Sequence, residues 1–291
     1  MKSPSFLPRV VLLVLLLSLC SAARAATTID AVNKYAYGAN IGWLNAYADG
    51  ANGAVIGDNV CMGYIYGANV GWINLGSGSP VNGIRYGNLS AGDFGVNHDG
   101  FGNLSGYAWG ANIGWIAFEA IGAPKVNLRT GILSGYVWSA NCGWISLSNS
   151  VAYVQTDSFW PGQLDSNGLP IWWELQNFGS TGINPIADPD HDGMSNMQEY
   201  LAGTDPNNGS DYLHITAYGF SPGFTTIGLT WTSVLNRFYH IQKSPTLTGA
   251  VWVDSGVGLI SPGSPTTTQS FGDSATPDRF YRVRASRPLA P

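Results

Sequence analysis

The chain is poor in charged residues, histidine and cysteine. Only 11% of its 291 residues are Asp, Glu, Lys or Arg, and it contains four histidines and three cysteines. Its formal net charge of −5 argues against a nucleic-acid partner, because binding to a phosphate backbone requires an excess of Lys and Arg. The histidines form no metal-ligating or catalytic-triad motif, and no glycine-rich phosphate loop is present. We therefore predict that the protein has no catalytic residues and is not an enzyme.

Long apolar runs are also absent, except at the N-terminus. Residues 10–20 are apolar, follow Lys2 and Arg9, and precede Ala23-Arg24-Ala25, the small-x-small pattern that signal peptidase cuts. This run is shorter than the roughly 20 residues that a transmembrane helix needs. We expect residues 1–25 to be a signal peptide and the mature chain to be secreted, extracellular or held at the cell surface, without a transmembrane segment. Loss of the three basic residues in this peptide would change the net charge from −5 to −8.

Two cysteines, Cys61 and Cys142, remain after removal of the signal peptide. An oxidising extracellular compartment favours a disulfide between them. Against this pairing, they occupy different places in the repeats described below, eleven residues before Trp72 and two before Trp144. Two alternatives therefore stay open: a disulfide, or two buried thiols.

Glycine and aromatic residues, by contrast, are abundant, and they favour short strands and tight turns over helical bundles. Residues 26–150 contain four copies of one motif: Tyr37-Gly-Ala-Asn-Ile-Gly-Trp43-Leu, Tyr66-Gly-Ala-Asn-Val-Gly-Trp72-Ile, Trp109-Gly-Ala-Asn-Ile-Gly-Trp115-Ile and Trp138-Ser-Ala-Asn-Cys-Gly-Trp144-Ile. The second tryptophans of these copies are separated by 29, 43 and 29 residues. This spacing indicates a pair of units that was itself duplicated, and predicts a four-copy aromatic β-repeat domain.

Each copy is expected to form an aromatic hairpin. Gly110-Ala111-Asn112 tolerates positive φ and permits a tight turn, after which Ile113 and Trp115 are expected to share one face of the returning strand. One unit cannot bury its aromatic face alone, so neighbouring units must stack. We expect the Trp and Tyr rings to be core. The alternative is a partly exposed aromatic platform that binds glycan or protein.

The third copy, Gly106-Tyr-Ala-Trp-Gly-Ala-Asn-Ile-Gly-Trp115, resembles the short GYAW-type repeats of secreted bacterial proteins. That resemblance implies no activity. Residues 95–100 are expected to add a third strand, and His98 among them is expected to be a solvated turn residue.

The segment 151–211 is acidic and predicts a cation site. It contains nine of the chain's 18 acidic residues, whereas the chain has no Lys or Arg between Arg129 and Arg237. Carboxylates gathered in this way repel one another unless a cation lies among them. The spacing within residues 188–199 matches the EF-hand loop, with carboxylates at positions 1, 3, 5 and 12, Gly193 at position 6 and Asn at position 9. We predict a calcium site with these ligands: Asp188, Asp190, Asp192, the backbone carbonyl of Met194, Asn196 and Glu199.

This loop departs from a full EF-hand, because Pro185 leaves no room for an entering helix. Ser195 and Gln198 predict a capping box for a short exiting helix, and Gly203 can end it. The run Asp188-Pro-Asp-His-Asp-Gly-Met-Ser-Asn-Met-Gln-Glu-Tyr-Leu-Ala-Gly-Thr-Asp-Pro206 resembles the EF-hand-like loop of bacterial thrombospondin type 3 repeats. The family implies calcium binding and a spacer role between extracellular domains.

Residues 163–174 resemble a second, decayed copy of this loop. Ligand types stand at positions 3, 5 and 12 (Asp165, Asn167 and Glu174), but Gln163 stands at position 1. Pro170 suits the first turn of a following helix, which Gly179 can stop. Whether this copy also binds calcium stays open.

Residues 212–291 contain short strand-like runs separated by turn residues. The runs cover residues 213–218, 225–232, 238–243, 251–253, 266–271 and 280–284. Six short strands in this length predict an immunoglobulin-like or fibronectin-like β-sandwich. The runs Tyr239-His-Ile-Gln-Lys-Ser244 and Phe280-Tyr-Arg-Val283 resemble a C-terminal module of secreted bacterial proteins. Four arginines make the end basic, and we expect them to lie on a solvated strand face.

The sequence thus predicts a mainly β chain with a repeat-built antiparallel domain, a short calcium loop-helix linker and a C-terminal β-sandwich. Its expected function is that of a secreted or cell-surface, non-enzymatic, calcium-binding structural or adhesive protein that displays the repeat array. The alternative is a carbohydrate-binding protein that uses exposed Trp and Tyr platforms. The expected partner is a surface polysaccharide or another extracellular protein. The exposure of the repeat tryptophans separates these hypotheses, since a solvent-exposed row favours carbohydrate binding.

Overall fold

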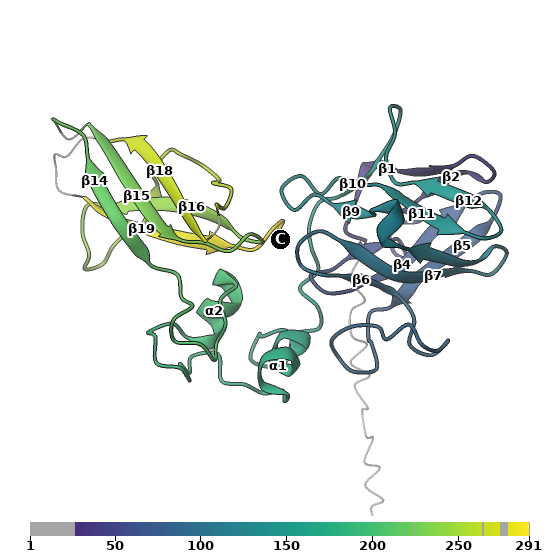
Figure 1. Cartoon of the computed structure of the whole chain (residues 1–291), viewed down its shortest axis with the longest axis horizontal. Helices are drawn as coiled ribbons and strands as arrows, with labels where there is room; N and C mark the ends of the chain where they lie inside the picture. The colour runs from purple at the N-terminus through teal and green to yellow at the C-terminus, as the bar shows by residue number, and fades with distance from the viewer. Residues whose placement is uncertain (1–26, 224, 264, 274–278, 291) are drawn as a thin grey trace, which may run out of the picture.

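The computed structural model describes residues 27–223, 225–263, 265–273 and 279–290, so the expected signal peptide lies outside the described residues. The described chain comprises an antiparallel barrel, a segment with two α-helices and a C-terminal pair of sheets (Figure 1). The predicted mainly β fold is confirmed. Neither α-helix in the described part has the length and apolarity needed to cross a membrane.

The barrel region begins at Thr27 and contains short strands joined by turns. Its elements are β1 (Ile29–Gly38), β2 (Gly42–Asn45), β3 (Val55–Ile56), β4 (Cys61–Gly67), β5 (Gly71–Ser77), β6 (Val96–His98), β7 (Leu104–Gly110), β8 (Gly114–Phe118), the 3-10 helix η1 (Ala120–Gly122), β9 (Lys125–Val126), β10 (Leu133–Ser134), β11 (Tyr136–Ser139), β12 (Gly143–Ser146) and β13 (Val154–Thr156). Strand β6 falls within the expected third strand at residues 95–100.

Eight of these strands close into a ring. Their order is β1-β2-β4-β5-β7-β8-β11-β12, and β12 pairs back onto β1 with Tyr37 opposite Ser146 and Gly38 opposite Ile145. Each neighbouring pair is antiparallel. Closure pairs the strands that would otherwise be sheet edges. Strand β13 pairs with another stretch of β1, so this sheet continues to Thr156.

Each motif copy folds as one hairpin of the ring. In the third copy Trp109 lies opposite Trp115 and Gly110 opposite Gly114, and the other copies repeat this register. The positive φ falls on Gly114 (71°) and its equivalents, and not on the preceding Asn. Residues 111–113 reverse the chain between the paired Gly110 and Gly114, and the left-handed backbone of Gly114 interrupts the side-chain alternation where the returning strand begins. Ile113 is consequently buried while Trp115 is 43% exposed, so the expectation that they share a face is wrong.

The motif asparagines connect successive hairpins in a closed ring of hydrogen bonds. Each Asn side-chain Nδ2 donates to the backbone oxygen of the turn residue in the preceding hairpin, at 3.0–3.1 Å. The four bonds run from Asn69 to Ile41, from Asn112 to Val70, from Asn141 to Ile113 and from Asn40 to Cys142. The ring therefore fixes the order of the four hairpins at one end of the barrel.

The barrel interior is filled by small and aliphatic side chains. The inward positions of the hairpins include Ala36, Leu44, Ala108 and Ile116, each at most 2% exposed. A cavity of about 20 Å³ lies elsewhere in the same core, among apolar residues that include Ala46, Cys61 and Phe118, and it is too small for an organic ligand. An eight-stranded barrel has room for little more than its own side chains, so the large motif rings lie on the outer face. The expectation that these rings form the core is therefore wrong.

The acidic segment contains helices α1 (Ile171–Phe178) and α2 (Asn196–Ala202). Pro170 precedes α1, and Gly179 and Gly203 end the two helices with left-handed backbone, as predicted. The predicted capping box of α2 is also present, with Gln198 Oε1 accepting a hydrogen bond from the Ser195 backbone at 2.8 Å.

The C-terminal region contains two three-stranded antiparallel sheets. One has the order β14 (Ile215–Phe220), β15 (Thr226–Thr232), β18 (Thr266–Gly272), and the other β17 (Val253–Asp254), β16 (Phe238–Ser244), β19 (Phe280–Ser286). Each of the six predicted runs overlaps one of these strands. Residues of both sheets share one core, which includes Trp231, Tyr239 and Ile241. The region is thus a two-layer sandwich.

Candidate functional sites

Three aspartates of the predicted calcium loop converge. Carboxylate oxygens of Asp188, Asp190 and Asp192 all lie within 4.8 Å of one another. The Asp188 carboxylate also accepts hydrogen bonds from the backbone nitrogens of His191 (2.8 Å) and Gly193 (3.0 Å), which fold the loop around it. Gly193 has a φ of 94°, so the sharp turn at position 6 requires glycine.

The remaining ligand candidates approach from helix α2. Glu199 is fully buried, and burial followed by the charges of Asp190 and Asp192 raises its pKa to about 8. Asn196 is 1% exposed, and its Nδ2 donates to the Asn184 backbone, which leaves Oδ1 free. The backbone nitrogen of Met194 donates to Asp192 Oδ1 at 2.7 Å.

Unpartnered oxygens show that this donor set fits a calcium ion. Six buried oxygens here have no hydrogen-bond partner in the described chain: both of Asp190, both of Glu199, Asp192 Oδ2 and Asn196 Oδ1. Buried polar atoms without partners are costly, and calcium takes six to eight oxygen ligands. The structure therefore brings three of the predicted ligands together, Asp188, Asp190 and Asp192, and Glu199 lies near enough for the charges of Asp190 and Asp192 to raise its pKa.

The second loop offers fewer free ligands. Asp165 Oδ1 accepts hydrogen bonds from the Asn167 and Gly168 backbones, and Glu174 Oε1 accepts one from Ile183 at 2.8 Å. Each of these two carboxylates therefore has one buried oxygen without a hydrogen-bond partner, Asp165 Oδ2 and Glu174 Oε2. Glu174 and Glu199 nevertheless occupy the same place, the fourth residue of their helices.

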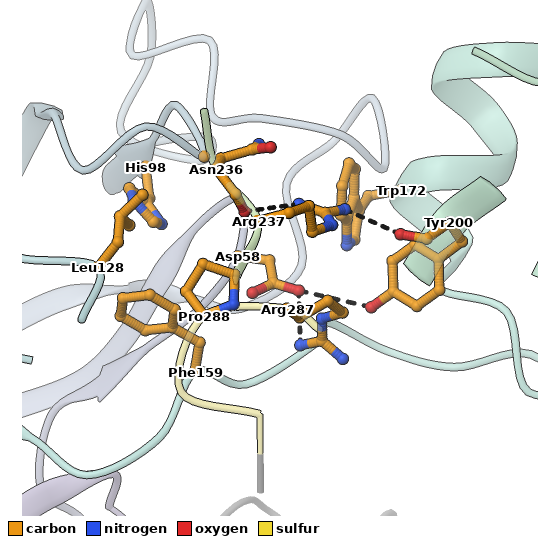
Figure 2. A pocket seen from close by; sticks show the side chains of 11 residues that line it. Asp58, His98, Leu128, Phe159, Trp172, Tyr200, Asn236, Arg237, Arg287 and Pro288 are labelled. Carbon is orange, nitrogen blue, oxygen red and sulfur yellow. Dashed lines mark hydrogen bonds and ion pairs between the residues drawn. The ribbon is translucent and has the colours of Figure 1, made fainter. Parts of the chain in front are cut away.

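A buried polar cluster joins the three parts of the described chain (Figure 2). Arg287, after β19, lies 2.7 Å from Asp58 of the barrel, and its guanidinium lies 5.3 Å from the ring centroid of Tyr200 in α2. Arg237 donates to the backbone oxygens of Tyr200 and Leu201 at 2.8 Å, which satisfies carbonyls at the helix C-terminus. The adjoining cavity is about 50 Å³, so this cluster is a structural junction.

The expectation of a solvated basic face is wrong for part of the C-terminal end. Arg287 is buried in the junction, and Arg279 pairs with Asp273 at 3.5 Å. Arg282 hydrogen-bonds Gln242 and stacks on Trp252 at 4.5 Å.

His98 is buried and not solvated as expected. It is 1% exposed, its Nδ1 lies 2.8 Å from the Gly57 oxygen, and its Nε2 accepts a hydrogen bond from the Gly102 nitrogen. Burial lowers its pKa, so the neutral ring is favoured. Both ring nitrogens are used in holding the barrel loops together.

Both Cys61 and Cys142 are buried thiols and not a disulfide. Cys142 occupies the inward turn position that Ile or Val fills in the other copies, which explains its place in the repeat. Burial raises the pKa of Cys61 to about 12.

The outer face of the barrel carries four equivalent aromatic clusters, each with three rings. They are Tyr35/Tyr37/Trp43, Tyr64/Tyr66/Trp72, Tyr107/Trp109/Trp115 and Tyr136/Trp138/Trp144. The central Trp lies 4.7–5.1 Å from the ring directly opposite and 5.9–6.3 Å from the diagonal Tyr. Its exposed fraction is 43–45% in all four clusters. Edge-to-face packing thus stabilises each cluster while leaving part of each Trp open to solvent.

Comparison with protein-family models, curated proteins and solved structures found no match to this chain. The function is therefore inferred from the geometry of these sites alone.

Proposed function

We propose that this chain is a secreted or cell-surface, non-enzymatic protein that binds carbohydrate through the outer face of its barrel. The observation that supports this proposal is the fourfold repetition of a partly exposed Trp between two flanking rings. Twelve surface rings are unusual on a monomeric protein, since exposed apolar area of this kind favours association. A sugar ring presents an apolar C–H face and a rim of hydroxyls, which suits an aromatic surface bordered by polar groups.

Small and polar residues separate the clusters. Where one hairpin pairs with the next, Tyr66 lies opposite Asn45 and Trp109 lies opposite Asn74. The Oδ1 atoms of both Asn side chains accept hydrogen bonds from backbone nitrogens, so their Nδ2 groups are the donors that can reach the hydroxyls of a saccharide whose face stacks on the ring. Four such surfaces on one rigid ring would add weak contacts as avidity.

Calcium has a separate role in this proposal. The ion binds at Asp188, Asp190, Asp192, Asn196 and Glu199, with the Met194 carbonyl, and so holds helix α2 in place. Through Tyr200 and Arg237, that helix contacts both the barrel and the sandwich. Calcium would then fix the direction in which the barrel is presented, and would not contact the glycan.

The test is affinity electrophoresis of the full chain through gels containing soluble neutral polysaccharides, in calcium buffer. Replacing Trp43, Trp72, Trp115 and Trp144 with Ala should abolish retardation, and each single replacement should weaken it. Tyr218→Ala is the matched control, because this ring is 74% exposed but lies on the C-terminal sandwich. Full retardation of the four-Trp variant, or no retardation of the unmodified chain in any gel, would contradict the proposal.

A further inference from the structure

The third hairpin differs from the other three because a longer loop packs against the side of its aromatic cluster, while Trp115 stays as exposed as its equivalents. The step from Trp72 to Trp115 is 43 residues, against 29 for the steps on either side. The additional chain lies between β5, which ends at Ser77, and β6, which begins at Val96. From this loop Phe94 packs on Trp115 edge to face, with ring centroids 5.1 Å apart and an interplanar angle of 80°.

A pocket of about 430 Å³ lies between the loop and the cluster. Residues 88–91 and Phe94 line it on the loop side, and Tyr107 and Trp115 line it on the barrel side. Its volume falls within the range of roughly 300–1,000 Å³ that is typical of small-ligand sites. The cavity inside the barrel, by contrast, is about 20 Å³.

Hydrogen bonds hold the loop wall in place. The Asp93 carboxylate accepts from the backbone nitrogens of Val81 (3.1 Å) and Gly87 (2.9 Å). Asn88 Oδ1 accepts from the Gly95 nitrogen at 3.0 Å, and the Asn88 nitrogen donates to the Asp93 oxygen at 2.9 Å. A wall that is already ordered loses little entropy when a ligand binds.

The lining chemistry selects the class of ligand. No lining side chain is charged, which favours a neutral molecule over an acidic one. The hydroxyls of Ser90 and Tyr107 and the Nε1 of Trp115 make no hydrogen bond with any described residue, so they can pair with ligand hydroxyls. Three aromatic rings in edge-to-face contact, those of Phe94, Tyr107 and Trp115, supply the apolar surface. Aromatic surface, a hydrogen-bonding rim and the lack of charge together match a neutral pyranose.

We infer that this pocket is the principal saccharide site of the barrel and takes a neutral pyranose unit of a glycan chain. The inference rests on the function proposed above. The other three clusters have no equivalent of the long loop between β5 and β6, and we expect them to contact the same glycan more weakly.

The experiment is isothermal titration calorimetry of the full chain with three neutral hexasaccharides, cellohexaose, mannohexaose and N-acetylchitohexaose. Hexagalacturonic acid serves as the charged comparator. Two variants test the pocket: Trp115→Ala removes its stacking ring, and Ala91→Trp fills it from the exposed loop. Trp72→Ala is the comparator within the proposed binding face, because it removes the equivalent ring of another cluster, and Tyr218→Ala, on the C-terminal sandwich, is the control that should leave the affinity unchanged.

We expect at least one neutral hexasaccharide to bind, and both pocket variants to weaken it about tenfold or more, as the loss of one stacked ring predicts. Trp72→Ala should change the same affinity less than about threefold. Equal weakening by Trp72→Ala and Trp115→Ala would overturn the pocket inference and leave the proposed function intact. Unchanged affinity for Ala91→Trp, or a preference for hexagalacturonic acid, would also overturn the inference. Failure of the unmodified chain to bind any neutral oligosaccharide or polysaccharide would overturn both.

Discussion

The side-chain nitrogen of Asn40 lies 3.0 Å from the backbone oxygen of Cys142, 102 residues further along the chain. This hydrogen bond joins the first hairpin of the barrel to the last and completes a ring whose other three bonds join consecutive hairpins. Each Asn makes the same contact, but only the Asn40 bond depends on closure of the barrel.

Asn40→Ala should lower the free energy of unfolding by about 1 kcal/mol, the usual net contribution of one intramolecular hydrogen bond. Asn40→Asp should cost more, because it removes the donor and places a carboxylate against the Cys142 oxygen. Chemical denaturation would measure both. Gln176→Glu makes the same chemical change on an exposed residue of α1 and should be nearly neutral. Equal stability of Asn40→Asp and the unmodified chain would contradict a closed ring.

Cys61 and Cys142 should resist thiol reagents in the native protein. Both are buried, and the raised pKa of Cys61, about 12, keeps this thiol protonated at neutral pH. An Ellman titration should detect almost no thiol before unfolding and both thiols of residues 27–291 after unfolding in denaturant. Mass spectrometry of the unreduced protein would detect the two-dalton loss of a disulfide, and such a loss would contradict the buried-thiol arrangement.

Saturating calcium should stabilise the protein by about 3 kcal/mol at a concentration 100 times the dissociation constant, because the ion binds only the folded loop. Asp190→Asn and Glu199→Gln should remove most of this gain. Asp157→Asn, on an exposed residue of the same segment, should keep it. Differential scanning fluorimetry with calcium, with magnesium and with chelator would test the prediction, which fails if calcium and chelator give the same melting temperature.

Without calcium, stability should fall as the pH rises from about 4.5 to about 8. The folded protein holds a proton on Glu199 up to a pKa of about 8, whereas the unfolded chain releases it near the ordinary value of 4.5. The folded state therefore binds more protons in this window, and deprotonation favours unfolding. Glu199→Gln should flatten the pH dependence, and calcium should abolish it by replacing the proton. Denaturation in chelator at several pH values would measure the slope; a flat profile for the unmodified chain would count against this account.

Asp58→Ala should uncouple the sandwich from the barrel. It leaves Arg287 buried without its carboxylate, and breaking a buried ion pair from one side typically costs about 3–5 kcal/mol. Calorimetry should then resolve an earlier transition for the C-terminal region. A double-mutant cycle with Arg287→Ala would separate the interaction energy from the cost of the unpaired charge. If the effects of the two substitutions on the free energy of unfolding were additive, Asp58 and Arg287 would have no interaction energy, which would contradict the prediction.

Much of the local structure follows from short patterns in the sequence. The convergence of Asp188, Asp190 and Asp192 was predictable because alternate positions of one short loop can turn their carboxylates toward a common point. Helix α2 was predictable because Ser195 and Gln198 satisfy its first backbone nitrogens locally. The C-terminal strands were predictable because turn residues separate them. Each of these interactions joins residues that lie close together in the chain.

The position of the aromatic clusters, the pocket and the junction depends on contacts between residues that lie far apart in the sequence. Whether Trp115 is core or surface is decided by the radius of the closed ring, which leaves room inside only for small side chains. The positive φ of Gly114 then determines which neighbours of Trp115 face inward. Asp58 and Arg287 meet 229 positions apart in the numbering, so no local pattern identifies them. The one available signal for the pocket was the step of 43 residues instead of 29, which places an extra loop beside the third cluster.

The sequence alone therefore determined that four hairpins would form and that a loop with converging aspartates would follow them, because each depends on residues within about a dozen positions of one another. The tertiary structure decided that the hairpins close into a barrel with their rings outside, and that one cluster acquires a pocket. Closure and the outward position of the rings are set by how much volume the packed interior leaves, and that volume is a property of all eight strands together.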